Sequence, residues 1–108
     1  MTSQEAWLKI VAHLQTKSIE FPTVPKIKRD PVWFDASTDG EIIMINPAKN
    51  NRPSSQLTMQ RKLGYKVFEK VYPLYLRRIN GEAVSNEALR TTVNQVYFFS
   101  LIKHCCNL

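Results

Sequence analysis

The chain has 108 residues, of which 44% are hydrophobic and 10% aromatic, and it carries a net charge of +6. This length suits a single domain spanning 1–108, and the composition excludes a disordered chain. No run of about 18 apolar residues is present, which excludes a membrane-spanning helix. Two adjacent cysteines, Cys105 and Cys106, have no distant partner for a disulfide, which indicates a cytoplasmic protein.

The first expected element is an amphipathic helix over residues 3–15. Thr2 and Glu5 are spaced as a capping box, in which each side chain bonds the backbone N–H of the other residue. Apolar residues then recur at helical spacing, at Trp7, Ile10, Val11 and Leu14. Two prolines exclude a helix in the next segment, so residues 17–31 are expected to cross the surface in extended form.

An antiparallel β-hairpin is expected next. Residues 32–34 and 41–45 are β-branched or aromatic runs, and the turn cluster between them ends in Asp39-Gly40, a pair typical of tight hairpin turns. Residues 42–45 are all apolar, which predicts that both faces of this strand are covered. Alternating residues at 56–59 indicate a third short strand within a long polar loop.

Two C-terminal helices complete a predicted α+β fold. The first begins after Gly64 and continues through an apolar stripe, with Pro73 predicting a kink or a division into two pieces. The stripe consists of Phe68, Val71, Tyr72, Tyr75 and Ile79. The second begins at the cap Ser85, with Val84 and Leu89 as its hydrophobic staple, and runs to about residue 104. Because its residues 96–102 are apolar on nearly every side, it should be either the centre of the core or half of an interface. Val96 and Phe99 are expected in the core.

Two metal-site patterns are weaker than their structural alternatives. Residues 35–42 place oxygen side chains and a glycine as a calcium loop does, but the twelfth position is Asn46 and strands flank the segment, which favours a metal-free hairpin tip. His104 and the two cysteines are zinc ligands, but three consecutive residues do not easily surround a tetrahedral ion. No metal and no cofactor is predicted.

A basic segment between residues 49 and 66 is the predicted nucleic-acid site. No acidic residue lies between Glu41 and Glu69, and lysines and arginines of this kind contact phosphates. The candidate residues are Lys49, Arg52, Arg61, Lys62 and Lys66, with a second basic cluster at Lys26, Lys28 and Arg29. The loop over residues 47–61 contains no aromatic residue on which a base could stack, so the alternative is a solvated loop.

Large aromatic rings on the two C-terminal helices predict self-association. Six such rings are hard to bury in a domain of this size, and a symmetric second copy would cover the remainder. The candidate interface residues are Tyr72, Tyr75, Tyr97 and Phe98. A homodimer or other homo-oligomer is therefore expected.

The helical patterns of residues 61–72 (RKLGYKVFEKVY) and 94–102 (NQVYFFSLI) carry a family resemblance. The second half of the chain resembles small uncharacterised proteins of bacterial mobile DNA, including those on integron gene cassettes. The resemblance implies a bacterial origin and oligomeric assembly, and it implies no active site.

Three functions fit these observations. The first is a non-enzymatic binding or adaptor domain that self-associates through its aromatic helices. The second is a nucleic-acid-binding protein that uses the loop 49–66. The third is a small-molecule binder or enzyme with a pocket between the hairpin and the last helix. Catalytic motifs such as a phosphate-binding glycine loop or a nucleophile elbow are absent, which favours a non-enzymatic protein.

Overall fold

The computed structural model of the protein describes residues 1–25 and 30–108. One antiparallel sheet has the strand order β1-β2-β3-β4, with bounds β1 Ile19–Pro22, β2 Trp33–Thr38, β3 Ile43–Pro47 and β4 Arg61–Leu63. The helices are α1 Ser3–Leu14, α2 Tyr65–Ile79, α3 Ser85–Thr91 and α4 Gln95–Cys106. The predicted α+β class is confirmed.

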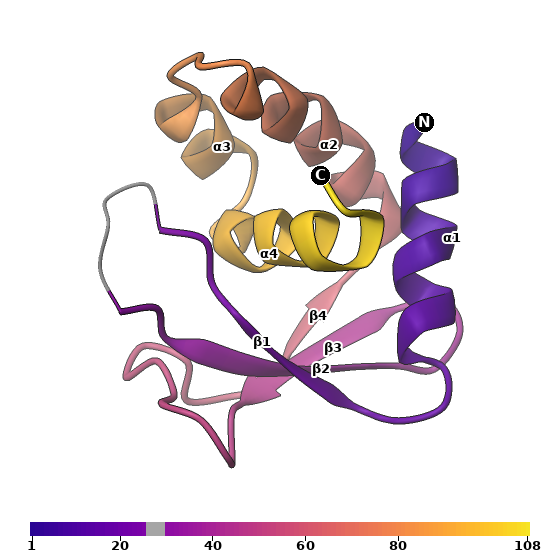
Figure 1. The fold of residues 1–108 in the computed structure, drawn as a ribbon, viewed down its shortest axis with the longest axis vertical. Coiled ribbons are helices and arrows are strands. Elements are labelled where there is room, and N and C mark those ends of the chain that lie inside the picture. The colour runs from indigo at the N-terminus through magenta and orange to yellow at the C-terminus, as the bar shows by residue number, and fades with distance from the viewer. Residues whose placement is uncertain (26–29) are drawn as a thin grey trace.

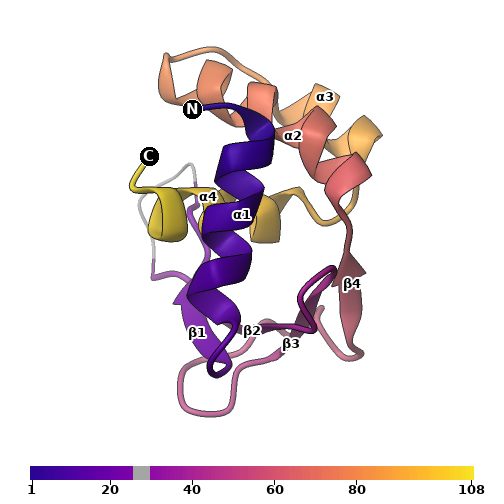
Figure 2. The same cartoon turned by 90° about the vertical axis from the view of Figure 1, so that its right-hand side faces the viewer.

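The helices all lie on one side of the sheet (Figure 1). α1 contacts β2 and α4 contacts β1, while α2 and α3 lie over α4 on the side away from the strands. In the perpendicular view, β4 leads directly into α2, and α1 lies in front of α4 (Figure 2). α4 is thus enclosed between the sheet and the other helices, which makes it the centre of the core.

The N-terminal helix follows its sequence pattern. Thr2 and Glu5 form the predicted capping box, with the Glu5 N–H donating to Thr2 Oγ1 at 3.1 Å and the Thr2 N–H donating to Glu5 Oε1 at 2.9 Å. The predicted apolar stripe is buried against the core. The capping box therefore predicted the start of the helix, and the periodicity predicted its buried face.

The hairpin of β2 and β3 is confirmed, but its turn and its faces differ from the prediction. Thr38 pairs with Ile43, so the loop has four residues and not the two of a tight turn. The Asp39 carboxylate accepts hydrogen bonds from the two N–H groups that follow Gly40, each at 2.9 Å, and Gly40 adopts φ +104. Only one face of β3 is fully covered, because Ile43 and Ile45 are buried while Met44, and Ile42 just before the strand, are only partly buried.

The third strand lies at a different place in the sequence from the one predicted. It is β4, which pairs with β3, whereas residues 56–59 form no strand. A fourth strand, β1, pairs with β2 inside the segment expected only to be extended. Both are short edge strands of three or four residues, so each depends on its neighbour more than on its own sequence pattern.

The C-terminal half contains three helices and not two. α2 continues through Pro73 as a single helix, so the alternative of two pieces is wrong, and the alternative of a kink stays a prediction. Pro73 is exposed, and buried side chains on either side hold the helix to the core. The predicted last helix is divided, because Thr92 is extended (φ −163, ψ 148) and α4 begins after Asn94. The division lets α3 and α4 pack separately on α2 and each other.

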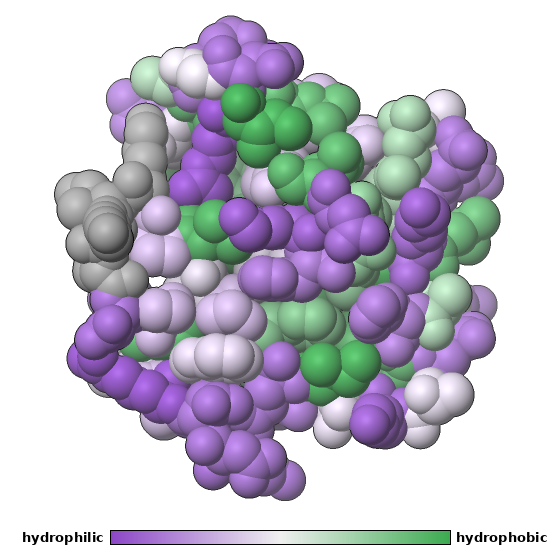
Figure 3. Space-filling view, in the orientation of Figure 1, coloured by the Kyte–Doolittle hydropathy of each residue, from purple (hydrophilic) through white to green (hydrophobic). Residues whose placement is uncertain are grey.

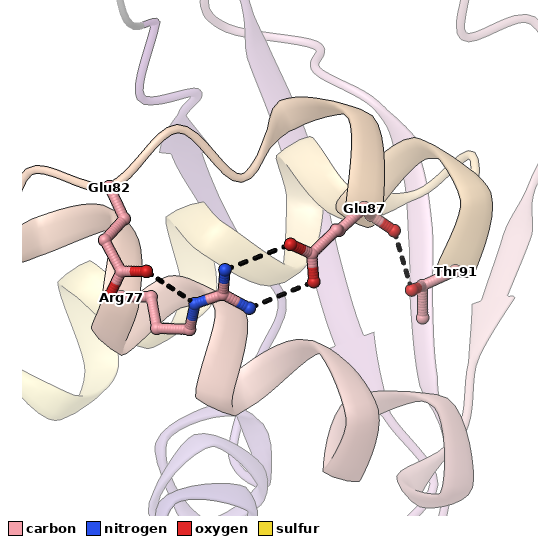
Figure 4. Close-up of polar contacts among 4 residues, drawn as sticks. All are labelled: Arg77, Glu82, Glu87 and Thr91. Carbon is pink, nitrogen blue, oxygen red and sulfur yellow. Dashed lines mark hydrogen bonds and ion pairs between the residues drawn. The ribbon is translucent and has the colours of Figure 1, made fainter.

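An ion-pair cluster connects α2 to α3 (Figure 4). The Arg77 guanidinium donates to both carboxylate oxygens of Glu87 at 3.0 Å, and its Nε donates to Glu82 at 3.0 Å. These bonds keep the Glu87 pKa below its ordinary value. The cluster orients a short helix that buries few residues of its own.

Candidate functional site

The loop that follows β3 returns alongside the start of β2 and forms one wall of the site. The Trp33 N–H donates to the Arg52 carbonyl at 2.7 Å, and Trp33 forms an isolated parallel bridge with Pro53. The first residues of β2 and the basic loop are therefore held side by side, although 19 positions separate Trp33 from Arg52.

Glu20 on β1 fixes the same loop from its other end. Its Oε2 accepts from the backbone N–H groups of Lys49 at 2.8 Å and Asn50 at 2.9 Å, and its Oε1 accepts from the backbone and side-chain nitrogens of Asn51. The Asn50 backbone bond and the bonds beside it hold the Glu20 pKa below its ordinary value. One carboxylate thus orders three consecutive loop residues.

A cavity of about 620 Å³ lies between this loop, the start of β2 and the first turn of α4. Its volume falls within the range of small-molecule sites, roughly 300–1,000 Å³. Apolar and polar groups line it in similar measure, which suits a ligand that has both a flat apolar part and a charged part. The lining residues are Thr23, Val24, Pro25, Asp30, Val32, Trp33, Arg52, Ser54, Ser55, Gln56, Val96 and Tyr97.

Of the predicted basic residues, Arg52 lines this cavity and Arg61 lies behind its wall. Arg52 lines it directly, and among the described residues its guanidinium makes no hydrogen bond or ion pair. Arg61 lies behind the wall: its guanidinium is 5.6 Å from the centroid of the Tyr97 ring and donates to Asn94 Oδ1 at 2.9 Å. Burial raises the Tyr97 pKa, which Arg61 opposes, so the phenol of this lining residue is neutral.

Trp33 supplies the aromatic surface that the basic loop lacks. It is half-buried, whereas its neighbour Phe34 is fully buried. Successive side chains of a strand point to opposite faces, so one of two adjacent aromatic residues must leave the core. The adjacent aromatic residues Trp33 and Phe34 therefore indicate, from the sequence alone, that one of the two rings lies outside the core. Only the fold shows that this residue is Trp33 and that it lies beside the loop.

The other predicted basic residues do not join Arg52 and Arg61. Lys49 is exposed near the Glu20 anchor, and Lys66 is exposed on the first turn of α2. Lys62 is exposed on β4, where alternation with buried Leu63 puts it on the sheet face away from the helices. Of the five cations predicted for one site, only Arg52 lines the cavity, and their binding to nucleic acid stays a prediction. The second cluster, Lys26, Lys28 and Arg29, lies outside the described residues.

The predicted interface residues are core residues. Their exposed fractions within one chain are 4% for Tyr72, 2% for Tyr75, 4% for Tyr97 and 1% for Phe98. The expectation that these rings stay open for a second copy is wrong, because α1, α2, α3 and the sheet together enclose α4. Phe99 is buried as predicted, whereas Val96 is 42% exposed and is not a core residue.

The two segments weighed as metal sites have structural roles. Asp39 caps the hairpin turn, and Asp35 lies within β2 opposite Glu20 and Asn46. At the C-terminus, His104 stacks on Phe21 with the ring centroids 5.9 Å apart. Both cysteine thiols are buried, and burial raises the pKa of Cys105 to about 12. Thiols of this kind are inert towards oxidants and alkylating agents.

Within the described part of the chain, no helix has the length and apolar character needed to cross a bilayer. Apolar residues on the face in Figure 3 are interspersed with polar ones and form several small patches.

Comparison with protein-family models, with curated proteins and with solved structures finds no match to this chain. The resemblance to mobile-DNA proteins therefore stays a prediction.

Proposed function

We propose that this protein is a non-enzymatic binding domain whose ligand, a small anion with a flat apolar part, occupies the cavity at Trp33, Arg52 and Tyr97. The observation that carries the proposal is that an exposed arginine, Arg52, and a half-buried tryptophan, Trp33, both line one cavity of about 620 Å³. This corresponds to the third function considered from the sequence, a small-molecule binder with a pocket between hairpin and last helix.

Each part of the ligand has a matching group in the cavity. A guanidinium forms two parallel hydrogen bonds with a carboxylate or phosphate, and Arg52 can offer such an edge. The hydroxyls of Ser54 and Ser55 lie on the same loop and can donate to the same anion. The Trp33 indole offers a flat surface for stacking, and the net charge of +6 attracts anions from solution.

The anchored loop supports a site that exists before the ligand arrives. Glu20 holds residues 49–51, and the Trp33 N–H holds the Arg52 carbonyl. A site ordered in advance loses less conformational freedom on binding, which increases affinity. Self-association stays a prediction without an assigned surface, since its four proposed rings belong to the core.

The proposal is tested by following the two indole N–H signals in a ¹⁵N–¹H correlation spectrum. Trp7 is buried between α1 and α2, so it provides an internal reference, and Trp33→Phe assigns the second signal. Titration with adenosine monophosphate, salicylate and benzenesulfonate should shift the Trp33 signal and leave that of Trp7 in place.

Two charge variants provide the control. Arg52→Gln should weaken binding about tenfold, because one charged contact to the anion is lost. Lys70→Gln, an equal charge change at an exposed position of α2, should have little effect. If none of the three anions shifts the Trp33 signal at millimolar concentration, the proposed function is wrong.

A further inference from the structure

A second, smaller cavity continues the first along the start of α4. It has a volume of about 180 Å³ and is lined by Arg78 and Phe99 at its far end. Val24, Pro25 and Val96 line both cavities, so the two are parts of one groove. The groove runs from Arg52 and Trp33, past Val96, to Arg78.

Val96 forms the shared part of the groove wall. Its exposed fraction of 42% separates it from the buried residues that follow it in α4. An exposed apolar side chain between two polar ends is a surface on which a flat ring or a sugar can lie. The groove is therefore apolar in the middle, with an arginine at each end, and Asp30 also lines the end that holds Arg52.

Arg78 is held rigidly at the far end. Its Nη2 donates to the Val24 carbonyl at 2.9 Å, and its guanidinium carbon is 5.0 Å from the centroid of the Phe99 ring. A guanidinium has five N–H donors, and these contacts use one of them among the described residues. The remaining donors can bind an anion without any rearrangement of the side chain.

We infer that the natural ligand of this groove is a short single-stranded segment of nucleic acid, with phosphates at Arg52 and Arg78 and a base on Trp33. The inference rests on the proposed function, since it extends the same cavity. Two arginines separated by an apolar wall match a chain whose phosphates alternate with flat bases. A duplex is excluded as the preferred ligand because its bases are stacked inside and cannot reach an indole.

The test compares ligands of increasing length by fluorescence anisotropy and by the Trp33 indole signal. The probes are thymidine monophosphate, a labelled pentathymidylate, and a labelled duplex of mixed sequence. The pentathymidylate should bind at least about tenfold more tightly than the mononucleotide, because a second phosphate and further stacking are added. With two phosphates bound, a plot of the logarithm of the binding constant against the logarithm of the salt concentration should have a slope of about −1.4 on the single strand. Five phosphate contacts would give a slope of about −3.5.

Three variants locate the contacts. Arg52→Gln should weaken the binding of both the mononucleotide and the pentathymidylate. Arg78→Gln should weaken the binding of the pentathymidylate alone, by about tenfold. Val96→Glu adds a negative charge to the wall that both cavities share, so it should weaken binding of the mononucleotide and of the pentathymidylate; this exposed position serves if the Arg78 variant does not fold. Lys70→Gln is the matched control on the outside of α2.

The outcomes separate the inference from the function beneath it. If the mononucleotide binds as tightly as the pentathymidylate, or if the duplex binds as tightly as the single strand, the inference is overturned and the cavity remains a small-anion site. If the anions of the first test bind but neither nucleotide ligand does, the inference is also overturned. If no probe binds at all, both proposals fail.

Discussion

The guanidinium of Arg61 lies over the ring of Tyr97, 5.6 Å from its centroid. The first residue was predicted to bind phosphate and the second to form an oligomer interface. In the fold they support one another at the wall of a cavity, with Arg61 also bonded to Asn94 and to the Gln56 carbonyl.

Arg61→Gln should therefore reduce the stability of the fold. The cation–π contact and a charged hydrogen bond are lost, which together contribute about 1–2 kcal/mol to the free energy of unfolding. The neighbouring Lys62→Gln makes the same charge change on the exposed face of β4 and should alter the free energy by less than about 0.5 kcal/mol. Urea denaturation of both variants measures the difference; equal effects would contradict a structural role for Arg61.

Glu20→Gln should loosen the loop without unfolding the domain. The amide keeps one acceptor oxygen and loses the charge that attracts the three N–H groups of residues 49–51. Amide hydrogen exchange at these residues should become faster, while the core of α4 exchanges as before. Glu41→Gln, exposed at the hairpin tip, is the control, and unchanged exchange in the Glu20 variant would show that the anchor is dispensable.

Phe98→Ala should destabilise the monomer and not an assembly. Phe98 is 1% exposed and lies against Phe68, with ring centroids 6.0 Å apart. Truncation of a buried phenylalanine costs about 3–5 kcal/mol, whereas the exposed Val96→Ala should cost less than about 0.5 kcal/mol. Urea denaturation and light scattering are the measurements. If the wild type is a dimer and Phe98→Ala is a folded monomer, Phe98 lies in the dimer interface and its assignment to the core is wrong.

Acidification should destabilise the domain through His104. Burial against Phe21 lowers its pKa below the ordinary value of 6.5, with a further contribution from Lys103. As the pH falls below 6.5 the unfolded chain binds the proton before the folded chain does, so stability decreases in that window. Denaturation at pH 7.5 and pH 5.5 should show a smaller loss for His104→Gln than for the wild type. An equal loss in both would assign the pH dependence to other groups.

The cluster in Figure 4 predicts unequal effects for its two carboxylates. Glu87 receives two hydrogen bonds from Arg77 and lies in the first turn of α3, whereas Glu82 receives one. Glu87→Gln should therefore lower the melting temperature more than Glu82→Gln, and the difference should shrink in high salt, since both partners are partly exposed. Thermal melts at two salt concentrations provide the comparison; a reversed order would mean that α3 is positioned by other contacts.

Local patterns in the sequence predicted what depends on near neighbours. The capping box at Thr2 and Glu5, the buried stripe of α1, the hairpin and the start of α2 at Gly64 all follow from residues within one or two turns. The α+β class follows from the order of these elements. Such features are set by backbone geometry and by periodicity, which the sequence contains directly.

Only the tertiary structure decided which apolar residues and which charges face solvent. The rings of Tyr97 and Phe98 are buried because four elements surround α4, and no spacing in the sequence states how many neighbours a helix has. For the same reason the sequence of the basic loop did not indicate which residues lie beside it. Arg52 lies next to Trp33 because two distant segments pair. Long-range packing brings such residues together, and its free energy depends on the whole fold and not on any local pattern.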